Sequence, residues 1–351
     1  MALTGSVFGA SAAYRAASKA PSGIVSRVGT QLYLNGSPYR FVGLNIYNAN
    51  SRQNCWYSMG TGSDLADSLT AVNATGGRAN AFRAWFFQDL ATTGGQRDWT
   101  AFDHTLAVAQ QYGFKVVVTL GNQWGDCDAG GYRTEGWYQG GYRTSPDPGM
   151  PSTYDQWVQQ VVTRYKGNSA VLAWQLMNEA EDLVAGGGSC SATAEASLQA
   201  FAQDVGAKVK KIDPNHLLSL GTIGSGQCGS SGTDYQKLYS VSTLDLCEYH
   251  DYGAPTTPMP GDQWNGLAER LAQCAALNKP LFVGETGIQT ADAGSLALRA
   301  ADFEAKLTTQ FGAGVAGELV WDWREAAYGG SSTTGYEVGP GDPVLPYLKT
   351  P

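Results

Sequence analysis

The sequence has few charged residues and no long apolar run. Only 15% of its 351 residues are charged, and 31 acidic residues outnumber 23 basic ones, which gives a net charge of −8. Nucleic acids and anionic membranes attract clusters of Lys and Arg, so we expect neither as a partner. A stretch of about 18 consecutive apolar residues, the length that a membrane-spanning helix needs, does not occur.

Residues that bind transition metals are also scarce. The chain has three His and six Cys, and no two Cys form a C-x-x-C pair. This spacing argues against a zinc site, and we expect neither a metal nor a cofactor. Aromatic residues are plentiful instead, with 18 Tyr and 10 Trp, and the 43% of hydrophobic residues can form a large core. Wholesale disorder is therefore excluded.

The cysteines indicate where the protein works. Six is an even number, and several cysteines lie in Gly/Ser-rich stretches such as "GGGSC" and "SGQCGSSG". Such a pattern is typical of disulfides and favours a secreted, extracellular protein. Six free thiols in a cytosolic enzyme are the alternative. Residues 1–25 lack the basic start and apolar core of a signal peptide, so we expect that a secreted form has lost its signal.

Short apolar runs alternate with longer segments of helical periodicity. The apolar runs begin at eight places, namely Arg40, Asn80, Lys115, Val171, Leu217, Leu244, Pro280 and Gly317. The expected helices are Trp99–Tyr112, Tyr154–Tyr165, Ala192–Ile212, Gln263–Leu277 and Leu296–Phe311. Eight such units predict an α/β fold, the (β/α)8 TIM barrel. A doubly wound open sheet is the alternative, but the Gly-rich phosphate turn that it needs after its first strand is missing.

The stretch before the first apolar run predicts a β-hairpin. In "VSRVGTQLYLNGSPYRF", apolar and polar residues alternate around Asn35–Gly36, a favoured two-residue turn. We expect this hairpin to close the barrel floor. No linker or low-complexity run divides the chain. The prediction is one catalytic domain over residues 26–351, preceded by a loosely attached segment over residues 1–25.

Polar and aromatic residues gather at the ends of the apolar runs, where a (β/α)8 barrel carries its chemistry. They are Asn45, Tyr47, Arg83, Trp85, Asn122, Trp124, Asn178, Glu179, His250, Tyr252, Glu285, Trp321 and Trp323. Ionisable groups within apolar strands are costly unless they are paired. Their repetition at one end of many strands indicates a functional site, although a Glu paired with Arg83 for structure alone is the alternative.

Glu179 and Glu285 are carboxylates on the fourth and seventh predicted strands. Two carboxylates across a barrel mouth suit the cleavage of an acetal. One attacks the anomeric carbon, and the other protonates the leaving oxygen and later activates water. In retaining glycosidases the two carboxyl groups lie roughly 5–5.5 Å apart. The pair therefore indicates a glycoside hydrolase.

The motifs "QLMNE" and "FVGETG" around these residues resemble the two signature strands of glycoside hydrolase family 5. That family has the (β/α)8 fold and comprises retaining β-glycosidases, and the resemblance runs from about residue 25 to residue 347. It implies that Glu179 is the acid/base and Glu285 the nucleophile. It also implies that Asn178 holds the sugar 2-hydroxyl and that Trp321 forms the platform under the cleaved sugar. Ala180 departs from the family, which usually has proline there.

The same resemblance assigns the neighbours of the nucleophile. Arg83 would lower the pKa of Glu285 and keep it ionised. His250 and Tyr252, in "HDY", would bracket the site, with Tyr252 bonding Glu285. Burial beside a second carboxylate would raise the pKa of Glu179, so that it holds a proton near neutral pH.

The loop after the third strand favours a particular substrate. The run "NQWGDCDAGGY", with Asn122 and Trp124, resembles the N-x-W-x-D-x-G-G run of endo-β-1,4-mannanases, whereas many cellulases of the family have His at this strand end. A Gly-rich turn around a core Trp is the alternative. We predict an endo-acting β-mannanase. The long segment 133–150 could wall off the cleft, so an exo-acting β-mannosidase, β-glucosidase or disaccharide-releasing enzyme stays open. So does an endo-β-glucanase, while a glycan-binding barrel without catalysis would usually have lost a carboxylate.

Further aromatic residues are candidates for sugar stacking outside the cleaved position. The set is Trp85, Trp124, Trp137, Tyr142 and Trp323. For Trp85 and Trp323, a place in the barrel wall is the alternative. The expected partner is a β-linked oligo- or polysaccharide, and the expected state is a monomer.

Disulfides are predicted in chain order, although six cysteines allow 15 pairings. Cys55 and Cys127 follow strands that end on the catalytic face. Cys190 and Cys228 follow the neighbouring fourth and fifth strands. Cys247 and Cys274 lie on the sixth strand and on the helix after it. Each pair thus falls on one face or on consecutive elements.

Overall fold

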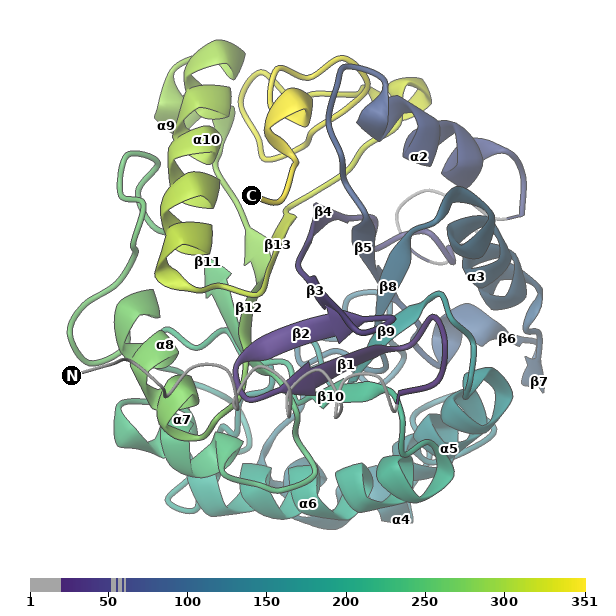
Figure 1. Ribbon diagram of the computed structural model, residues 1–351. Helices are drawn as coiled ribbons and strands as arrows, with labels where there is room; N and C mark the ends of the chain where they lie inside the picture. Colours follow the sequence, from purple (N-terminus) through teal and green to yellow (C-terminus); the bar gives the residue numbers. More distant parts are fainter. Residues whose placement is uncertain (1–19, 52–54, 56–58, 60) are drawn as a thin grey trace.

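The computed structural model describes residues 20–51, 55, 59 and 61–351. At its centre, eight parallel strands form a barrel (Figure 1). They are β4 (Phe41–Asn45), β5 (Ala81–Trp85), β8 (Lys115–Thr119), β9 (Val171–Gln175), β10 (Leu217–Ser219), β11 (Cys247–Asp251), β12 (Leu281–Thr286) and β13 (Gly317–Val320). Each of the eight apolar runs contains one of these strands, and the predicted (β/α)8 fold is confirmed.

The sheet closes between β10 and β11. Neighbouring strands pair in the order β10-β9-β8-β5-β4-β13-β12-β11. Across the remaining gap, the backbone N–H of Leu246 donates to the carbonyl of Leu218 at 3.1 Å. The N–H of His250 donates to the carbonyl of Ile223 at 2.8 Å. These bonds fix the position of His250 at the barrel mouth.

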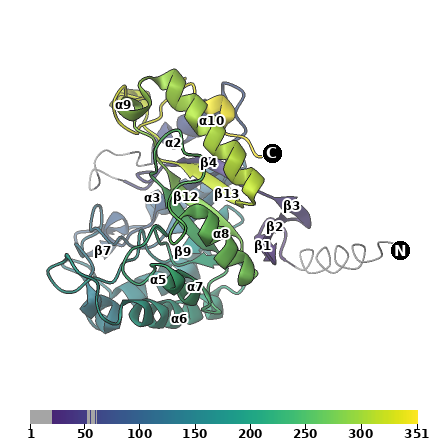
Figure 2. The same cartoon turned by 90° about the vertical axis from the view of Figure 1, so that its left-hand side faces the viewer.

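Helices surround the barrel (Figures 1 and 2). They are α2 (Asp64–Asn73), α3 (Thr100–Tyr112), α4 (Tyr142–Thr144), α5 (Tyr154–Tyr165), α6 (Ala194–Ile212), α7 (Thr233–Tyr239), α8 (Leu267–Ala276), α9 (Thr290–Ala293) and α10 (Leu296–Ala313). All the expected helices occur, with small shifts at their ends. α5 begins at a capping box, in which Thr153 and Gln156 each accept a hydrogen bond from the other's backbone N–H, at 3.3 and 3.1 Å.

Shorter elements lie in the connections. They are β6 (Thr92–Thr93), β7 (Gln96–Arg97), three 3₁₀ turns at Asp89–Ala91, Ala326–Tyr328 and Leu345–Tyr347, and a π-helical turn at Trp137–Gly141. No helix of the part of the chain described here is long and apolar enough to cross a membrane.

An N-terminal sheet closes the barrel floor. β1 (Val25–Val28), β2 (Gln31–Leu34) and β3 (Ser37–Tyr39) pair in antiparallel fashion. Asn35 and Gly36 have φ angles of 52° and 80°, the left-handed conformation that this turn requires. Figure 2 shows β1–β3 at one end of the barrel and long loops at the other. The predicted hairpin is confirmed, with one strand added. Of the segment expected to be loosely attached, residues 1–19 lie outside the described residues.

Three disulfides connect the loops and helices. Their Cα–Cα distances are 4.9 Å for Cys55–Cys127, 5.0 Å for Cys190–Cys228 and 6.3 Å for Cys247–Cys274. These are the pairs expected from chain order. No cysteine is left free, so the alternative of six thiols does not hold for this structure.

Candidate active site

The two carboxylates lie together at the mouth of the barrel, opposite the floor. Glu285 lies on β12, and Glu179 lies just beyond β9, where its φ of 59° turns the chain inward. Their oxygens and a ring nitrogen of His250 all lie within 4.8 Å of one another. This spacing is close to the roughly 5–5.5 Å of retaining glycosidases and well below the roughly 6.5–9.5 Å of inverting ones.

Glu285 is buried and held from two sides. Its Oε1 accepts a hydrogen bond from Nη1 of Arg83 at 2.8 Å, and its Oε2 accepts one from the hydroxyl of Tyr252 at 2.5 Å. Arg83 is itself fully buried, and it also donates to Asn45 at 3.0 Å and to Asn178 at 2.5 Å. Because the guanidinium is planar and rigid, these contacts fix Glu285 and Asn178 relative to each other.

Glu179 is more open and has different partners. Its side chain is 14% exposed, against 4% for Glu285. Nδ1 of His250 lies 2.7 Å from Oε1 of Glu179. The indole Nε1 of Trp124 donates to Oε2. Glu179 therefore faces the cleft, while Glu285 lies deeper in the barrel.

These contacts set pKa directions opposite to those expected from the sequence. Burial raises the pKa of Glu285, and the charge of Glu179 adds to this, so that together they outweigh His250 and Arg83. Burial also acts to raise the pKa of Glu179, but the hydrogen bond and charge of His250 lower it overall. The pKa expected for Glu179 from the sequence did not include its hydrogen bond with His250. The pKa of the more buried carboxyl group is thus raised, and the pKa of the group bonded to His250 is lowered.

Asn178 and Asn122 have separate tasks. Because Oδ1 of Asn178 accepts from Arg83, its NH2 group faces the other way and donates to Oδ1 of Asn122 at 3.0 Å. Asn122 is only 1% exposed, and its own NH2 group donates to the carbonyl of Asp126 at 2.8 Å. Asn122 therefore orients Asn178, and its contact with substrate stays a prediction.

The aromatic residues at the strand ends divide between cleft and core. Trp321 is partly buried and stacks on Tyr47, with ring centroids 5.2 Å apart and planes at 14°. Trp85 is 5% exposed and packs against Tyr47 at 4.6 Å. Trp323 is fully buried, and its indole N–H donates to Ser68 at 2.8 Å. The burial of Trp323 and Trp85 favours the alternative given for them, a place in the barrel wall, and their contact with sugar stays a prediction.

Two other residues predicted to stack on sugars, Trp137 and Tyr142, pack against a helix outside the barrel. Trp137 packs against Phe201 of α6 with ring centroids 5.5 Å apart. Tyr142 is 3% exposed, and its hydroxyl donates to Asp204 at 2.6 Å. The segment 133–150 thus folds onto α6, so its residues Trp137 and Tyr142 do not face the cleft. Of the predicted platforms, Trp124 is exposed, at 38%, with its ring 5.4 Å from that of Tyr132.

A buried polar layer, not predicted from the sequence, lies beneath the carboxylates. Gln175 on β9 accepts from Nε of Arg83 at 2.8 Å and donates to Glu248 on β11. Glu248 in turn lies 3.2 Å from Nε2 of His250. Both residues are fully buried. The sequence contains one indication of this layer, because Glu248 is an ionisable residue within an apolar run.

One group of described residues offers three metal-ligand atoms close together, namely Glu179, His250 and Glu285. Two contacts disfavour a cation there. Nδ1 of His250 is already hydrogen-bonded to Glu179, and the positive charge of Arg83 lies 2.8 Å from Glu285. The arrangement suits proton transfer and nucleophilic attack better than metal binding.

A parallel eight-stranded barrel with two carboxylates so close at its mouth defines a class, the (β/α)8 glycoside hydrolases. The particular family follows from a family model. Residues 35–326 match the model described as Cellulase (glycosyl hydrolase family 5), and the chain belongs to that family.

Similar proteins agree on the fold. The chain is 28% identical over 243 residues to "Probable mannan endo-1,4-beta-mannosidase F" of Aspergillus flavus. The aligned region covers 66% of this chain and 49% of that protein. The chain is 26% identical to "Mannan endo-1,4-beta-mannosidase A" of Hypocrea jecorina, over 89% of this chain and 72% of that one. The chain thus spans about half the length of the Aspergillus relative. The endo-1,4-β-mannanase structure from Rhizomucor miehei superposes with a TM-score of 0.70 over 93% of this chain and 97% of that chain, at 19% identity.

Proposed function

We propose that this chain is an endo-acting β-1,4-mannanase that cleaves with retention of configuration at the anomeric carbon. The observation that carries the proposal is the spacing of Glu179 and Glu285, whose oxygens lie within 4.8 Å. Such a distance leaves no room for a water molecule between a base and the sugar, so direct attack by a carboxylate is favoured. The relatives named as mannan endo-1,4-β-mannosidases support mannan as the substrate.

In the first step, Glu285 attacks the anomeric carbon and Glu179 protonates the leaving oxygen. Arg83 and Tyr252 hold the attacking carboxylate from 2.8 and 2.5 Å. Glu179 must be protonated and Glu285 ionised when this step begins. Nδ1 of His250, 2.7 Å from Oε1 of Glu179, holds the acid in position.

In the second step, Glu179 acts as a base. Its carboxylate, now stabilised by His250 and Trp124, takes a proton from water, and the hydroxide formed releases the sugar from Glu285. During both steps, the partly buried face of Trp321 supports the sugar ring. We expect the second N–H of the Asn178 amide, whose orientation Arg83 and Asn122 fix, to donate to the sugar 2-hydroxyl.

A hollow on the leaving-group side favours endo action. Glu179 faces Trp124, and Trp124 packs on Tyr132. Beyond Tyr132 lies a cavity of about 490 Å³, lined also by Thr134 and by the three glycines 186–188. An endo-acting enzyme must hold several sugars beyond the cleaved bond, and the aromatic rings of Trp124 and Tyr132 beside this hollow suit sugar binding.

The three disulfides support the proposal that the enzyme is secreted and works outside the cell. A monomer is the proposed state.

A substrate panel tests the function. We expect the protein to hydrolyse linear β-1,4-mannan faster than β-1,4-glucan, and to lower the viscosity of a mannan solution before much reducing sugar forms. Release of mannose or a single disaccharide without loss of viscosity would indicate exo action. Faster hydrolysis of β-glucan would overturn the assignment to mannan.

A further inference from the structure

Behind His250 lies a third carboxylate that the proposed mechanism does not use. Glu248 precedes His250 by two residues on β11, and its side chain is fully buried. Its Oε1 lies 3.2 Å from Nε2 of His250, on the opposite side of the ring from Glu179. Because a buried carboxylate is costly unless it is paired and hydrogen-bonded, its position has to be stabilised by these neighbours.

The hydrogen bonds around Glu248 fix which ring nitrogen of His250 carries a proton. Oε1 of Gln175 accepts from Arg83 at 2.8 Å, so the NH2 group of Gln175 must face Glu248 and donate to it. Ser219 donates to the other oxygen of Glu248 at 2.9 Å. The carboxylate is thus an acceptor throughout, and Nε2 of His250 is left as the donor toward it.

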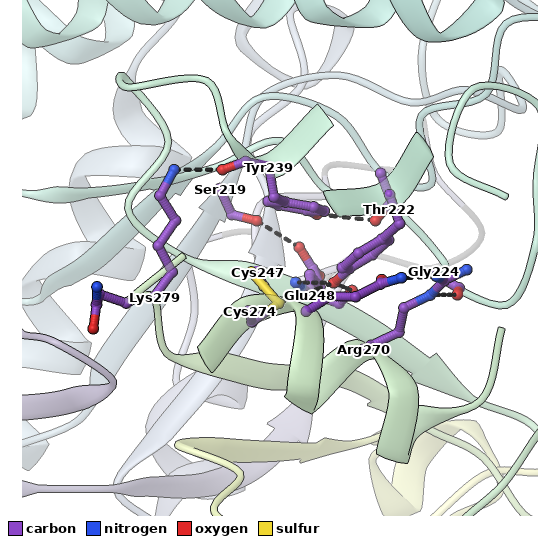
Figure 3. Close-up of a disulfide and its surroundings, with 12 residues drawn as sticks. Ser219, Thr222, Gly224, Tyr239, Cys247, Glu248, Arg270, Cys274 and Lys279 are labelled. Atoms are coloured by element: carbon purple, nitrogen blue, oxygen red, sulfur yellow. Dashed lines mark hydrogen bonds between the residues drawn. A yellow bond between two sulfur atoms is a disulfide. The ribbon is translucent and has the colours of Figure 1, made fainter. Parts of the chain in front are cut away.

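The surrounding structure holds Glu248 firmly in place. Figure 3 shows its hydrogen bond with Ser219 and the adjacent disulfide, which ties Cys247 to α8. The hydroxyl of Tyr235 donates to the carbonyl of Glu248 at 2.7 Å and accepts from its N–H at 3.2 Å. Gly284, next to Glu285, leaves the room for the carboxylate, since a Cβ at that position would lie 2.1 Å from its Oε1.

The charges around the His250–Glu248 pair are mostly negative. The titratable and charged groups that face the pair lie on β5, β12 and α7 and in the segments just after β9 and β11. They are Arg83, Glu179, Tyr235, Tyr239, Tyr252 and Glu285. Among the residues described, neither Lys nor Arg forms an ion pair with Glu248, and its cationic partner is His250. Burial acts to lower the pKa of His250, but the charge of Glu285 and the bonds to Glu179 and Glu248 raise it to about 10.

We propose that Glu248 is a positioning residue that keeps His250 doubly protonated, so that Nδ1–H remains a donor to Glu179 throughout the reaction. This inference rests on the proposed function. In the first step, the O–H bond of Glu179 breaks and its proton goes to the leaving oxygen. The charged imidazole then stabilises the carboxylate that remains. In the second step Glu179 takes a proton from water, and His250 neither gains nor loses one.

The substitution Glu248→Gln removes the charge and keeps the shape. Its carbonyl oxygen can still accept from His250 and Gln175, and the hydroxyl of Ser219 can turn to accept from the new amide. We expect kcat/KM near neutral pH to fall roughly 10- to 100-fold, the usual effect of losing such a supporting partner. The alkaline limb of the kcat/KM profile should move to lower pH by about one unit or more, because His250 loses the anion behind it.

A matched control is Glu318→Gln. Glu318 is also fully buried on a barrel strand, but its side chain accepts a hydrogen bond from the hydroxyl of Thr286, at 3.1 Å. This variant should leave the alkaline limb in place. The ¹⁵N spectrum gives a readout that needs no activity, because the chain has only three His. Wild-type His250 should show both ring nitrogens protonated between about pH 6 and 9, and Glu248→Gln should lower its pKa.

Two results would overturn the proposal. One is a Glu248→Gln enzyme whose loss of activity is the same at every pH, with an unchanged His250 titration. The other is a wild-type His250 whose Nε2 carries no proton, which decides the matter even if the variant fails to fold. Absence of glycosidase activity would refute the proposed function alone, since the ¹⁵N titration would still report on the His250–Glu248 pair.

Discussion

The indole N–H of Trp124 donates a hydrogen bond to Oε2 of Glu179, which joins the loop after β8 to the more exposed of the two carboxylates. The side chain of Trp124 is also 38% exposed, so we expect it to contact substrate as well. We expect Trp124→Phe to keep the stacking surface and to lose the hydrogen bond. A hydrogen bond to a charged group contributes about 1.5–3 kcal/mol, so kcat/KM for mannan should fall roughly 10- to 100-fold.

The control for this experiment is Tyr132→Ala, which removes aromatic surface beside Trp124 without touching Glu179. It should raise KM for long substrates and leave the pH profile unaltered. If Trp124→Phe also raises KM for long substrates and leaves the pH profile unaltered, the hydrogen bond to Glu179 has no catalytic effect.

Trp321 and Trp323 lie two residues apart and should respond to substitution differently. Trp323 is fully buried, so Trp323→Ala should lower the free energy of unfolding by about 3–5 kcal/mol, as expected for a large cavity. Trp321→Ala should cost much less stability and should greatly reduce kcat/KM. Denaturant unfolding and steady-state kinetics on both variants check this. Equal losses of stability would place Trp321 in the core as well.

The Cys247–Cys274 disulfide closes a loop with a sequence separation of 27. Replacing both cysteines by Ala should lower the free energy of unfolding by about 3–4 kcal/mol, because the unfolded chain regains freedom. Denaturant titration of the double variant measures the loss. Since Glu248 follows Cys247, the His250 titration of this variant should also be recorded. A double variant as stable as the wild type would show that neighbouring contacts alone hold β11 to α8.

The charge state of His250 predicts how stability depends on pH. Its pKa is raised to about 10 in the folded protein, against about 6.5 in an unfolded chain. The stability gained from this difference is fully present below about pH 6.5 and is lost as the pH rises through about 10. At about 1.4 kcal/mol per pH unit the contribution is at most about 5 kcal/mol. His250→Gln should therefore show a flatter fall in unfolding free energy on the alkaline side. His104→Gln, outside the barrel, should keep the wild-type slope.

Much of the barrel could be predicted from the sequence because strand ends of a parallel barrel meet on one face. Glu179, Glu285 and Arg83 stand at such ends, and the structure brings them together. Whether aromatic residues beyond the strand ends face the cleft or the core could not be predicted in this way. β13 ends at Val320, so the alternation of a strand no longer decides which way Trp321 and Trp323 face.

The hydrogen-bond networks of the site could not be predicted from the sequence either. The lowered pKa of Glu179 depends on its contact with His250, and no periodicity in the sequence gives that contact. Glu248 could have been found by asking why an apolar strand contains an ionisable residue. Its partners Gln175 and Ser219 lie on two other strands and become evident only once the barrel closes.

Substitution of each carboxylate separates their roles. Glu285→Ala should abolish nearly all activity, and added azide should restore turnover by forming the inverted glycosyl azide. Glu179→Ala should still react quickly in the first step with activated aryl glycosides, because a good leaving group needs little protonation. Azide should then intercept the glycosyl-enzyme and give the retained product. Rescue with the two configurations exchanged would mean that the roles are reversed.

The central claim, double displacement by Glu285 with Glu179 as acid and base, is tested most directly by proton NMR of the first-formed sugar. The spacing of the two carboxylates, within 4.8 Å, predicts that the product initially has the same anomeric configuration as the substrate. Mutarotation should then produce the other anomer. An initial product of inverted configuration would contradict the account, because Glu285 would then act as a base on water and form no bond to the sugar.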